Sequence, residues 1–408
     1  KEKSPEYKYK NCNLFFFGQI ISKLNTTTKT MTLICLTLSV SMILFVSVPA
    51  LIGWMNGYLD VRSLYDVQIN TKYNNVYDEK DLASDDYEIL TDYFSENGID
   101  TDFDKVVKLY LPLKDEFSKR QKLDFPILAI ALSDYNSLRK VQGFDPISLD
   151  DDEFAMQWQT TATKKYREEF LQQKKEVKSD AGTLRISKNP EHDDTIGETL
   201  YNTYTDAVYV FPDSVCDKLL SVKCNRYVVT REPVSYRDAV KIEELFNDKY
   251  KSPDDKEGVA YQIKTATVQK NSVKASSFVL RATLTYCAVV LMVICLTILS
   301  LQQLMDVPYY RYRFGVLDKI GVDEKQINGL IIKQLSVWFG LPVSLAFLVS
   351  IIGCASFLKV ISEQIAAYMG FGVLLHQVVG MVAIFACLLV GYYISTLHLL
   401  NGSIKQKE

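Results

Sequence analysis

The chain has 408 residues, with 46 Lys and Arg against 49 Asp and Glu, and a mean hydropathy near zero. This balanced charge excludes a strongly basic nucleic-acid-binding protein, and we expect no nucleic-acid partner. The charges are segregated, because four long segments contain no Asp, Glu, Lys or Arg: 31–53, 282–301, 334–358 and 373–397. Each is at least as long as the ~20 residues that a helix needs to cross a bilayer. The sequence therefore predicts a membrane α-helical protein with four transmembrane helices.

The distribution of Lys and Arg beside these segments predicts the orientation of the chain. Six of them lie in residues 1–29, five in 302–333 and two after residue 397, but only one lies in 359–372. Basic residues accumulate on the cytoplasmic side. Both termini are therefore expected in the cytoplasm, and residues 54–275, with 41 acidic and 31 basic side chains, are expected to form a large extracellular domain.

The expected organisation has nine parts. In chain order these are 1–30, a cytoplasmic segment with an amphipathic interfacial helix; 31–53, a transmembrane helix; 54–275, the extracellular domain; 276–301, a transmembrane helix; 302–333, a cytoplasmic coupling loop and helix; 334–358, a transmembrane helix; 359–372, a short outer connection; 373–397, a transmembrane helix; and 398–408, a cytoplasmic tail.

The passage before the first span has an apolar stripe. Leu14, Phe17, Ile21 and Leu24 recur at intervals of three and four, which predicts a helix lying in the cytoplasmic interface. The alternative is an ordinary N-terminal extension of the first span. Because the chain opens with Lys1 and not with a methionine, we expect either that further residues precede it or that the protein is processed.

The extracellular domain is expected to be α+β, because short strand-like and helical patterns alternate. The predicted strands are 62–70, 103–111, 125–132, 206–211, 225–231 and 258–268. The predicted helices are 84–97, 134–142, 160–177, 213–222 and 236–250. The turn-rich charged segments 145–153 and 188–194 suggest a division into two lobes.

Two cysteines and two acidic clusters are the candidate sites of this domain. Cys216 and Cys224 are either joined by a disulfide or free. The acidic residues around His192 indicate a solvated loop rather than a metal site. The run from Asp150 to Glu153 indicates a helix start favoured by the helix dipole rather than a calcium site. We expect no metal ligands in this chain.

The motifs of catalysis are missing. None of the 18 glycines is followed by Lys, so the chain has no Walker A loop, and it contains neither G-x-S-x-G nor H-E-x-x-H. We therefore expect a protein that is not an enzyme and has no cofactor of its own. If ATP drives its motion, another subunit hydrolyses the nucleotide.

The loop between the second and third spans predicts a short amphipathic helix. It begins at Pro308 and ends at Gly321, and basic residues accompany an apolar stripe at helical spacing: Tyr309, Tyr312, Val316 and Ile320. Asp323 is expected to cap the next helix. The alternative is a positively charged membrane anchor with no partner.

The spans themselves show almost no ionisable residue. Arg281 and His376 lie near the ends of two of them, and no polar translocation path is visible. A line of small residues at four-residue spacing in the last span predicts close helix packing; its members are Ala383, Cys387, Gly391 and Ser395. The alternative is that this line faces lipid.

Three segments resemble FtsX-like ABC transporter permeases, a family that includes macrolide exporters and bacitracin-resistance permeases. RYRFGVLDKIGVDEKQI, from Arg311, resembles the cytoplasmic loop of the family, although tyrosines replace its acidic and arginine-rich start. FPILAIALSDYNSLRKVQGFDPISL, from Phe125, resembles firmicute members. NLFFFGQIISKLNTTTKTM, from Asn13, resembles the approach to the last four-span module of the long bacitracin-type permeases. The order of one span, a large domain and three spans is also that of the family.

The resemblance implies a permease moved by a partner. A cytoplasmic ABC ATPase dimer, which carries ATP and Mg, would grip the loop, and its closing would move the extracellular domain. The residues implied in this coupling are Tyr309, Tyr310, Arg311, Tyr312, Arg313, Phe314, Leu317, Lys319 and Gly321. Other implied partners are membrane lipid, the rest of the permease or a second copy of it, a sensor kinase, and an extracellular peptide or lipid ligand.

Three functions compete on this basis. The first is the permease subunit of a mechanotransmission transporter in the plasma membrane of a Gram-positive bacterium, acting in antimicrobial peptide resistance by export, removal or sensing. The second is a regulatory module that activates a cell-wall hydrolase or a sensor kinase, or that extracts lipoproteins, without translocating a substrate. The third is a membrane enzyme, which the missing motifs disfavour.

Overall fold

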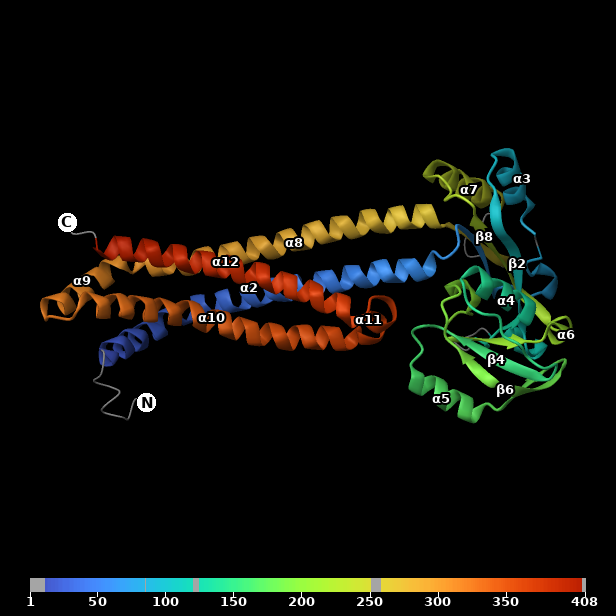
Figure 1. The fold of residues 1–408 in the computed structure, drawn as a ribbon, viewed down its shortest axis with the longest axis horizontal. Coiled ribbons are helices and arrows are strands. Elements are labelled where there is room, and N and C mark those ends of the chain that lie inside the picture. Colours follow the sequence, from blue (N-terminus) through green and yellow to red (C-terminus); the bar gives the residue numbers. More distant parts are fainter. Residues whose placement is uncertain (1–11, 85, 120–124, 251–257, 406–408) are drawn as a thin grey trace. The chain divides into compact units, whose positions relative to one another are not determined.

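The computed structural model describes residues 12–84, 86–119, 125–250 and 258–405, without the side chains of residues 24–26. The chain forms two compact units, each of which is described by itself. We call Lys1–Gly53 with Ser277–Glu408 the helical unit, and Trp54–Ser276 the sheet unit. Figure 1 shows their elements.

Four helices are long and apolar enough to cross a membrane, as predicted. They are α2 (Asn13–Arg62), α8 (Ala266–Met305), α10 (Glu324–Val360) and α12 (Phe371–Lys405). Two short helices connect the last three: α9 (Val307–Lys319) joins α8 to α10, and α11 (Ser362–Tyr368) joins α10 to α12. Each long helix extends beyond its predicted uncharged core, because polar residues at the ends continue the same backbone hydrogen bonding.

The predicted interfacial helix is not a separate element. Residues from Asn13 onward belong to the continuous 50-residue helix α2, which matches the alternative of an extension of the first span. Leu14 and Ile21 of the predicted stripe are exposed and Phe17 is half-buried, while the side chain of Leu24 lies outside the described residues. Phe16 packs against residues of α9, α10 and α12, which fixes the orientation of this part of α2.

The interior of the helical unit is apolar and closely packed. Side chains of α2, α8, α10 and α12 form one buried cluster, which includes Leu38, Met292 and Trp338. Hydroxyl groups add links between helices, since Ser41 Oγ donates to the carbonyl oxygen of Ala288 at 2.7 Å. Such bonds are available because α2 and α8 approach closely at small residues.

The sheet unit contains one mixed sheet of nine strands in the order β5-β6-β4-β7-β3-β2-β8-β1-β9. The strands are β1 (Val67–Asn75), β2 (Thr101–Leu111), β3 (Ala129–Ala131), β4 (Glu153–Trp158), β5 (Glu176–Ser179), β6 (Gly182–His192), β7 (Ala207–Phe211), β8 (Leu220–Thr230) and β9 (Gly258–Thr265). The β3–β7 and β4–β6 pairs are parallel, and the other pairs are antiparallel.

One sheet crosses the expected boundary between two lobes. Segments 145–153 and 188–194, which suggested the division, lead into β4 and contain the end of β6, and both strands belong to the same sheet. Ladder hydrogen bonds cross the proposed boundary, because β4 pairs with β7 and β7 with β3. A single sheet therefore carries the whole unit.

Among the described residues of this unit, five helices accompany the sheet, and each overlaps a predicted one. They are α3 (Glu88–Glu96), α4 (Leu132–Val141), α5 (Lys164–Gln173), α6 (Asp213–Cys216) and α7 (Tyr236–Lys249). Three short 3-10 helices also occur: η1 (Glu79–Asp81), η2 (Lys114–Ser118) and η3 (Glu198–Leu200). Helix α6 is much shorter than its predicted range 213–222, because β8 already begins at Leu220.

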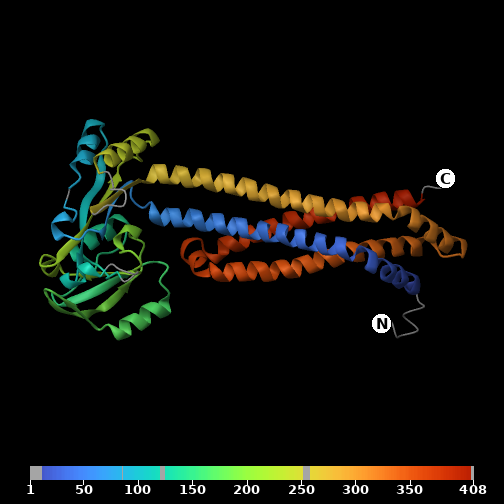
Figure 2. The same cartoon turned by 180° about the vertical axis from the view of Figure 1, so that it is seen from behind.

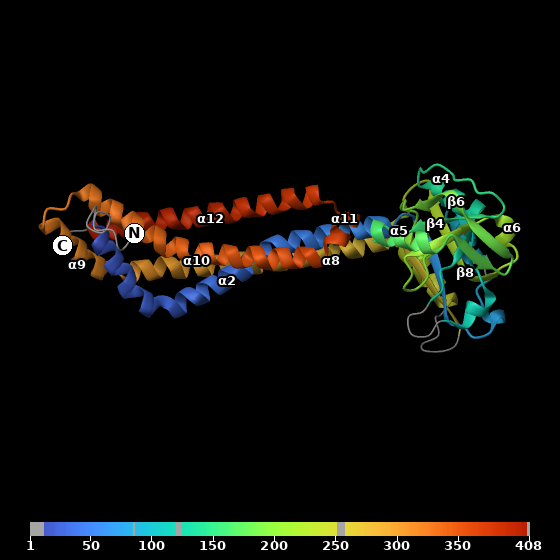
Figure 3. The same cartoon turned by 90° about the horizontal axis from the view of Figure 1, so that it is seen from below.

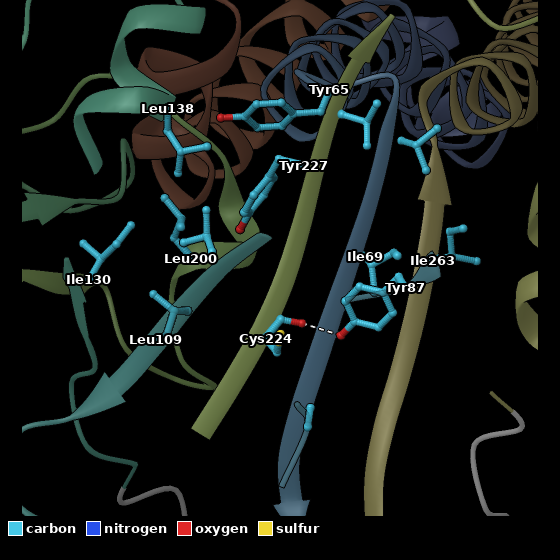
Figure 4. Close-up of a cluster of buried hydrophobic side chains, with 14 of the residues drawn as sticks. Tyr65, Ile69, Tyr87, Leu109, Ile130, Leu138, Leu200, Cys224, Tyr227 and Ile263 are labelled. Carbon is cyan, nitrogen blue, oxygen red and sulfur yellow. Dashed lines mark hydrogen bonds between the residues drawn. The ribbon is translucent and has the colours of Figure 1, made fainter. Parts of the chain in front are cut away.

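Several tyrosines take part in the main core of the sheet unit, among them Tyr65, Tyr87 and Tyr227 (Figure 4). Tyr65 and Tyr227 pack with ring centroids 4.8 Å apart, and the Tyr65 hydroxyl donates to the carbonyl oxygen of Ile196. The Tyr87 hydroxyl donates to the carbonyl oxygen of Cys224 at 2.5 Å. The hydroxyls of Tyr65 and Tyr87 therefore each have an acceptor, which removes the cost of burying an unpaired hydroxyl.

The junction between β9 and α8 has no connecting loop. Strand β9 ends at Thr265, and α8 begins with the next residue, Ala266 (Figure 2). Glu243 of α7 fixes this point, because its Oε1 accepts hydrogen bonds from the backbone N–H of Thr265 at 2.9 Å and from its hydroxyl at 2.6 Å. The direction of the first turn of α8 is thus tied to the edge of the sheet.

Candidate functional site

Helix α9 has the turn chemistry that the sequence predicts. Pro308 occupies its first turn, where a missing N–H costs nothing. Gly321 follows its last turn with a φ of +87°, a left-handed conformation that favours glycine. Asp323 is the N-cap residue of α10, although its side chain makes no capping bond. Residues close to its two ends, Pro308 and Gly321, therefore determine where α9 begins and ends.

One face of α9 is buried against the rest of the helical unit. Val307, Tyr310, Phe314 and Leu317, at spacings of three and four, form this face. We call the following group the connector cluster: these four residues with Phe16 of α2, Ile327, Leu330 and Ile331 of α10, and Leu400 of α12. Figure 3 shows α9 at the same end of the helical unit as the start of α2 and the end of α12. The connector cluster therefore joins α9 to three long helices.

The apolar stripe that the sequence predicts on α9, from Tyr309 to Ile320, lies on the side opposite to the packing face of this helix. Tyr312 and Ile320 are 75% and 72% exposed, and Tyr309 and Val316 are also exposed. Both stripes have helical spacing, but the neighbouring helices cover the one that contains Phe314 and Leu317. An apolar stripe thus remains on the surface of the helical unit, where contiguous apolar side chains mark an interaction surface.

The residues implied in coupling divide between these two faces. Tyr310, Phe314 and Leu317 are buried in the connector cluster and are not on the surface. Tyr309, Arg311, Tyr312, Lys319 and Gly321 are exposed, and Arg313 is half-buried.

The two arginines of α9 make different contacts. Arg311 donates from Nη2 to the carbonyl oxygen of Ser403 at 2.6 Å, which ties α9 to the end of α12. The guanidinium of Arg313 lies 4.1 Å from the ring centroid of Tyr309, close enough for a cation–π interaction. Arg313 therefore packs against Tyr309, a residue of the exposed stripe on the same helix.

A half-buried ion pair fixes α2 to the start of α9. Lys23 of α2 forms an ion pair with Asp306, the N-cap residue of α9, and donates to the hydroxyl of Tyr310 at 2.6 Å. Burial lowers the pKa of Lys23 to about 8, and it raises the pKa of Tyr310. A second polar link connects α10 to α2, since Lys333 Nζ donates to Asn13 Oδ1 at 3.0 Å.

The small-residue line of α12 does not pack against another helix of this chain. All four residues are exposed: Ala383, Cys387, Gly391 and Ser395. A side chain added at Gly391 would meet no atom within 4 Å. Larger side chains such as Phe385 and Tyr392 make the contacts inside the unit instead, because they bury more apolar area. The prediction of close packing along this line is wrong within the chain.

An apolar groove of about 710 Å³ lies between α2, α10 and α12. The described residues that line it carry no charge, and its only hydroxyl groups belong to Ser344 and Ser350. Arg281 and His376 are both exposed on their helices rather than in this groove. The groove is therefore suited to apolar groups and not to a hydrated ion.

The candidate sites of the sheet unit have other roles. Cys216 and Cys224 are both buried and are not joined by a disulfide, because each packs in a different apolar cluster. The acidic segment at His192 begins at the end of β6 and continues into the loop that follows it, and its carboxylates are paired with arginines, as in the Asp194–Arg139 contact of 2.6 Å.

The run from Asp150 to Glu153 precedes a strand and not a helix. A turn leads into β4, and Asp152 pairs with Arg185 of the neighbouring β6. Within the described part of the chain, no group of three or more His, Cys, Asp or Glu is placed to hold a metal ion.

A basic pocket in the sheet unit escaped sequence analysis. It brings together Arg62, Lys72, Lys223 and Lys264, which lie on four different elements. The available signal was the alternation of polar residues at 68, 70 and 72 and at 262 and 264, which places them on one face of each strand. Sequence alone does not reveal that β1 and β9 are neighbours.

These observations define a protein with four helices long and apolar enough to cross a membrane and an α/β sheet unit between the first and second of them. No protein-family model matches the chain, and a search of curated proteins finds no significant match. The function therefore has to be argued from the geometry and from the resemblance of the α9 segment.

Proposed function

We propose that this chain is the permease subunit of a mechanotransmission ABC transporter, driven by a separate cytoplasmic ATPase. The observation that carries the proposal is the two-sided character of α9. One face is fixed in the connector cluster, and the other presents an uncovered stripe of Tyr309, Tyr312, Val316 and Ile320. A helix built in this way can receive a partner on one side and pass its displacement to packed helices on the other.

The chain offers a direct route for such a displacement. Helix α8 begins immediately after strand β9 and ends at Met305, next to the N-cap residue of α9. Helix α2 contributes Phe16 and Lys23 to the contacts of α9 and continues to Arg62, five residues before β1. Both helices are therefore continuous between α9 and the sheet, and the proposal assigns them the transmission of force.

The proposed setting is the plasma membrane of a Gram-positive bacterium, with both termini and α9 in the cytoplasm and the sheet unit outside. The excess of Lys and Arg in 1–29 and 302–333 supports this orientation. The resemblance of the loop and of the N-terminal approach to bacitracin-type permeases supports a peptide antibiotic, or the lipid to which it binds, as the compound exported, removed or sensed.

The regulatory function is the second candidate. It is favoured by the groove between α2, α10 and α12, whose described lining is uncharged, and by the exposed positions of Arg281 and His376. Movement of the sheet unit against a hydrolase, a lipoprotein or a sensor kinase would require no polar path.

The proposal is tested by the substitution Tyr312→Glu in the full chain, co-expressed with a P-loop ATPase from the same organism that co-purifies with the wild type. Because Tyr312 is 75% exposed and outside the connector cluster, the variant should fold normally but lose most of its co-purification with the ATPase. Tyr236→Glu, at an exposed position of α7, is the matched control and should retain co-purification. Equal recovery of the ATPase with both variants would contradict the assignment of α9.

A further inference from the structure

A polar cavity of about 310 Å³ lies in the sheet unit, at the end of α2. Strands β1, β8 and β9 supply part of its lining, and residues 198–203 supply another part. The pairing Gln68↔Lys264 and Asn70↔Gln262 places alternate residues of β1 and β9 on one face of the sheet. The cavity is therefore built on regular strand geometry.

The charge of this cavity is strongly unbalanced. Four basic side chains line it, Arg62, Lys72, Lys223 and Lys264, and we call this site the basic pocket. Glu198 is the single carboxylate among the described residues of the lining. The basic pocket thus gathers an excess of three positive charges in a domain whose net charge is −10. A local excess of this kind attracts anions.

Lys223 is the most buried cation of the pocket. It is 3% exposed, and its Nζ donates to the carbonyl oxygens of Thr199 at 2.9 Å and Tyr201 at 3.2 Å. Neither acceptor carries a formal charge. The ammonium is therefore hydrogen-bonded but not neutralised, a state that costs free energy in a buried site.

The neighbouring charges increase this cost. Burial and the charge of Lys72 lower the pKa of Lys223 to about 7. Burial and the charge of Arg62 lower the pKa of Lys264 to about 8, although Glu198 opposes the shift. Burial raises the pKa of Glu198 itself, which weakens the only counter-charge. A bound anion would raise the pKa of both lysines and so favour their charged forms.

Asn70 supplies an independent observation. Its side chain is 8% exposed and lines the pocket, and its Oδ1 has no hydrogen-bond partner among the described residues. Buried amides are normally satisfied, and an exception calls for a missing partner. Rotation of the amide would present its two N–H donors, which suit an oxyanion as well as a water molecule.

We propose that the basic pocket binds the phosphate group of an anionic ligand, either free in solution or as the head group of a lipid. A phosphate carries close to two negative charges at neutral pH, so it matches an excess of three positive charges better than a single carboxylate does. Lysines act on phosphate as point charges, and the amides and hydroxyls of the lining can donate to its remaining oxygens. The site lies within the sheet unit and is independent of the ATPase proposed above.

The first test measures binding of inorganic phosphate by calorimetry to the full chain in phosphatidylcholine nanodiscs. Gln262→Glu places a carboxylate at an exposed position of the lining and should weaken binding at least tenfold, and Lys264→Gln should do the same. Gln172→Glu makes the same change at an exposed position of α5 and should bind like the wild type. Equal affinity of all four proteins would overturn the proposal.

The second test uses pH, with sulfate as the probe because its charge is constant between pH 6.5 and 9. The charged groups that line the pocket with Lys223 are Lys72 of β1, Lys264 of β9, Arg62 of α2 and Glu198. Tyr201 also lines it, and burial raises the pKa of this phenol and keeps it neutral. As the pH rises, Lys223 and Lys264 lose their protons, so affinity should fall about tenfold or more. Affinity that is independent of pH would contradict the role of these lysines.

The third test separates the two sources of phosphate. If a lipid head group is the ligand, phosphatidic acid in the nanodisc should raise the melting temperature of the wild type but not of Lys264→Gln, and free phosphate should then bind weakly. If free phosphate is the ligand, the stabilisation should come from phosphate in pure phosphatidylcholine. The proposal would be overturned if neither phosphatidic acid nor free phosphate raised the melting temperature of the wild type above that of Lys264→Gln. Because no ATPase is present, such a failure would leave the proposed function untouched.

Discussion

The ammonium group of Lys223 is a buried charge whose acceptors are two neutral carbonyl oxygens, those of Thr199 and Tyr201. Its pKa, about 7 against an ordinary value of 10.5, expresses the free energy that folding loses by burying it. An apolar side chain at the same position would cost folding less free energy than a buried lysine without a charged partner. Such a lysine therefore points to a functional role for its charge.

This shift predicts a pH dependence of stability with a definite sign. Below pH 7, Lys223 is protonated in both the folded and the unfolded chain. Between pH 7 and 10.5 the folded chain releases the proton while the unfolded chain keeps it, so stability rises with pH. The melting temperature of the wild type, minus that of Lys223→Met, should therefore increase between pH 7 and 10. Parallel melting curves of the two proteins across this range would contradict the assignment.

Single residues were predictable where their role is local. Gly321 could be assigned to a helix end because a left-handed residue after the last turn favours glycine. Lys223, Lys264 and Asn70 could not be assigned to one site, because the pairing of β8, β1 and β9 brings them together across nearly 200 residues of chain. Gly391 shows a different outcome. Its spacing in the small-residue line is typical of helix packing, but it lies on an exposed face of α12.

At the scale of elements, α9 shows how two stripes on one helix compete. The stripe with Phe314 and Leu317 is covered by α2, α10 and α12, whereas the stripe with Tyr312 and Ile320 is not. Helical spacing alone identifies both, and the neighbouring helices decide which one becomes interior. The buried stripe is therefore the one that sets the position of α9.

Phe314→Ala should loosen α9, whereas Tyr312→Ala should not. Phe314 is buried and contacts Phe15 and Tyr310 at ring distances of 5.9 and 6.1 Å, so its loss should cost about 3 kcal/mol. Hydrogen exchange of the α9 amides should accelerate in this variant and remain unchanged in Tyr312→Ala. Similar exchange in the two variants would mean that the connector cluster does not hold α9.

The long helices were predictable because each contains a long segment without Asp, Glu, Lys or Arg. Such a segment is typical of a helix that is buried or covered by lipid. Strands β4, β5 and β6 were missed for the opposite reason. Strand β6 contains Pro190 and alternates irregularly, and β5 has only four residues with two charges. These strands form one side of the sheet order, where pairing with neighbours rather than side-chain pattern maintains the strand.

At the scale of the whole molecule, the segregation of charge is the dominant property. The sheet unit contains most of the acidic residues, whereas the segments beside the long helices contain an excess of Lys and Arg. A bilayer favours one orientation of such a chain. The proposed function depends on that orientation, because a cytoplasmic motor can reach only the segments on its own side.

The orientation can be tested by labelling with a membrane-impermeant maleimide in a Cys12→Ser background. Asp150→Cys, at an exposed position of the sheet unit, should be labelled in intact cells. Ile320→Cys, at the exposed end of α9, should be labelled only after the membrane is opened. Labelling of position 320 from outside, or protection of position 150, would exclude the proposed topology.

The direct connection of β9 to α8 constrains the evolution of chain length. One residue added within the first turns of α8 would rotate every later side chain of that helix by about 100° around its axis and move it about 1.5 Å. The faces that contact α2 and α12 would then point elsewhere, while Thr265 stayed fixed by Glu243. Insertions of about seven residues, which restore the angle to within about 20°, would preserve the helical phase, whereas an insertion of one residue would not.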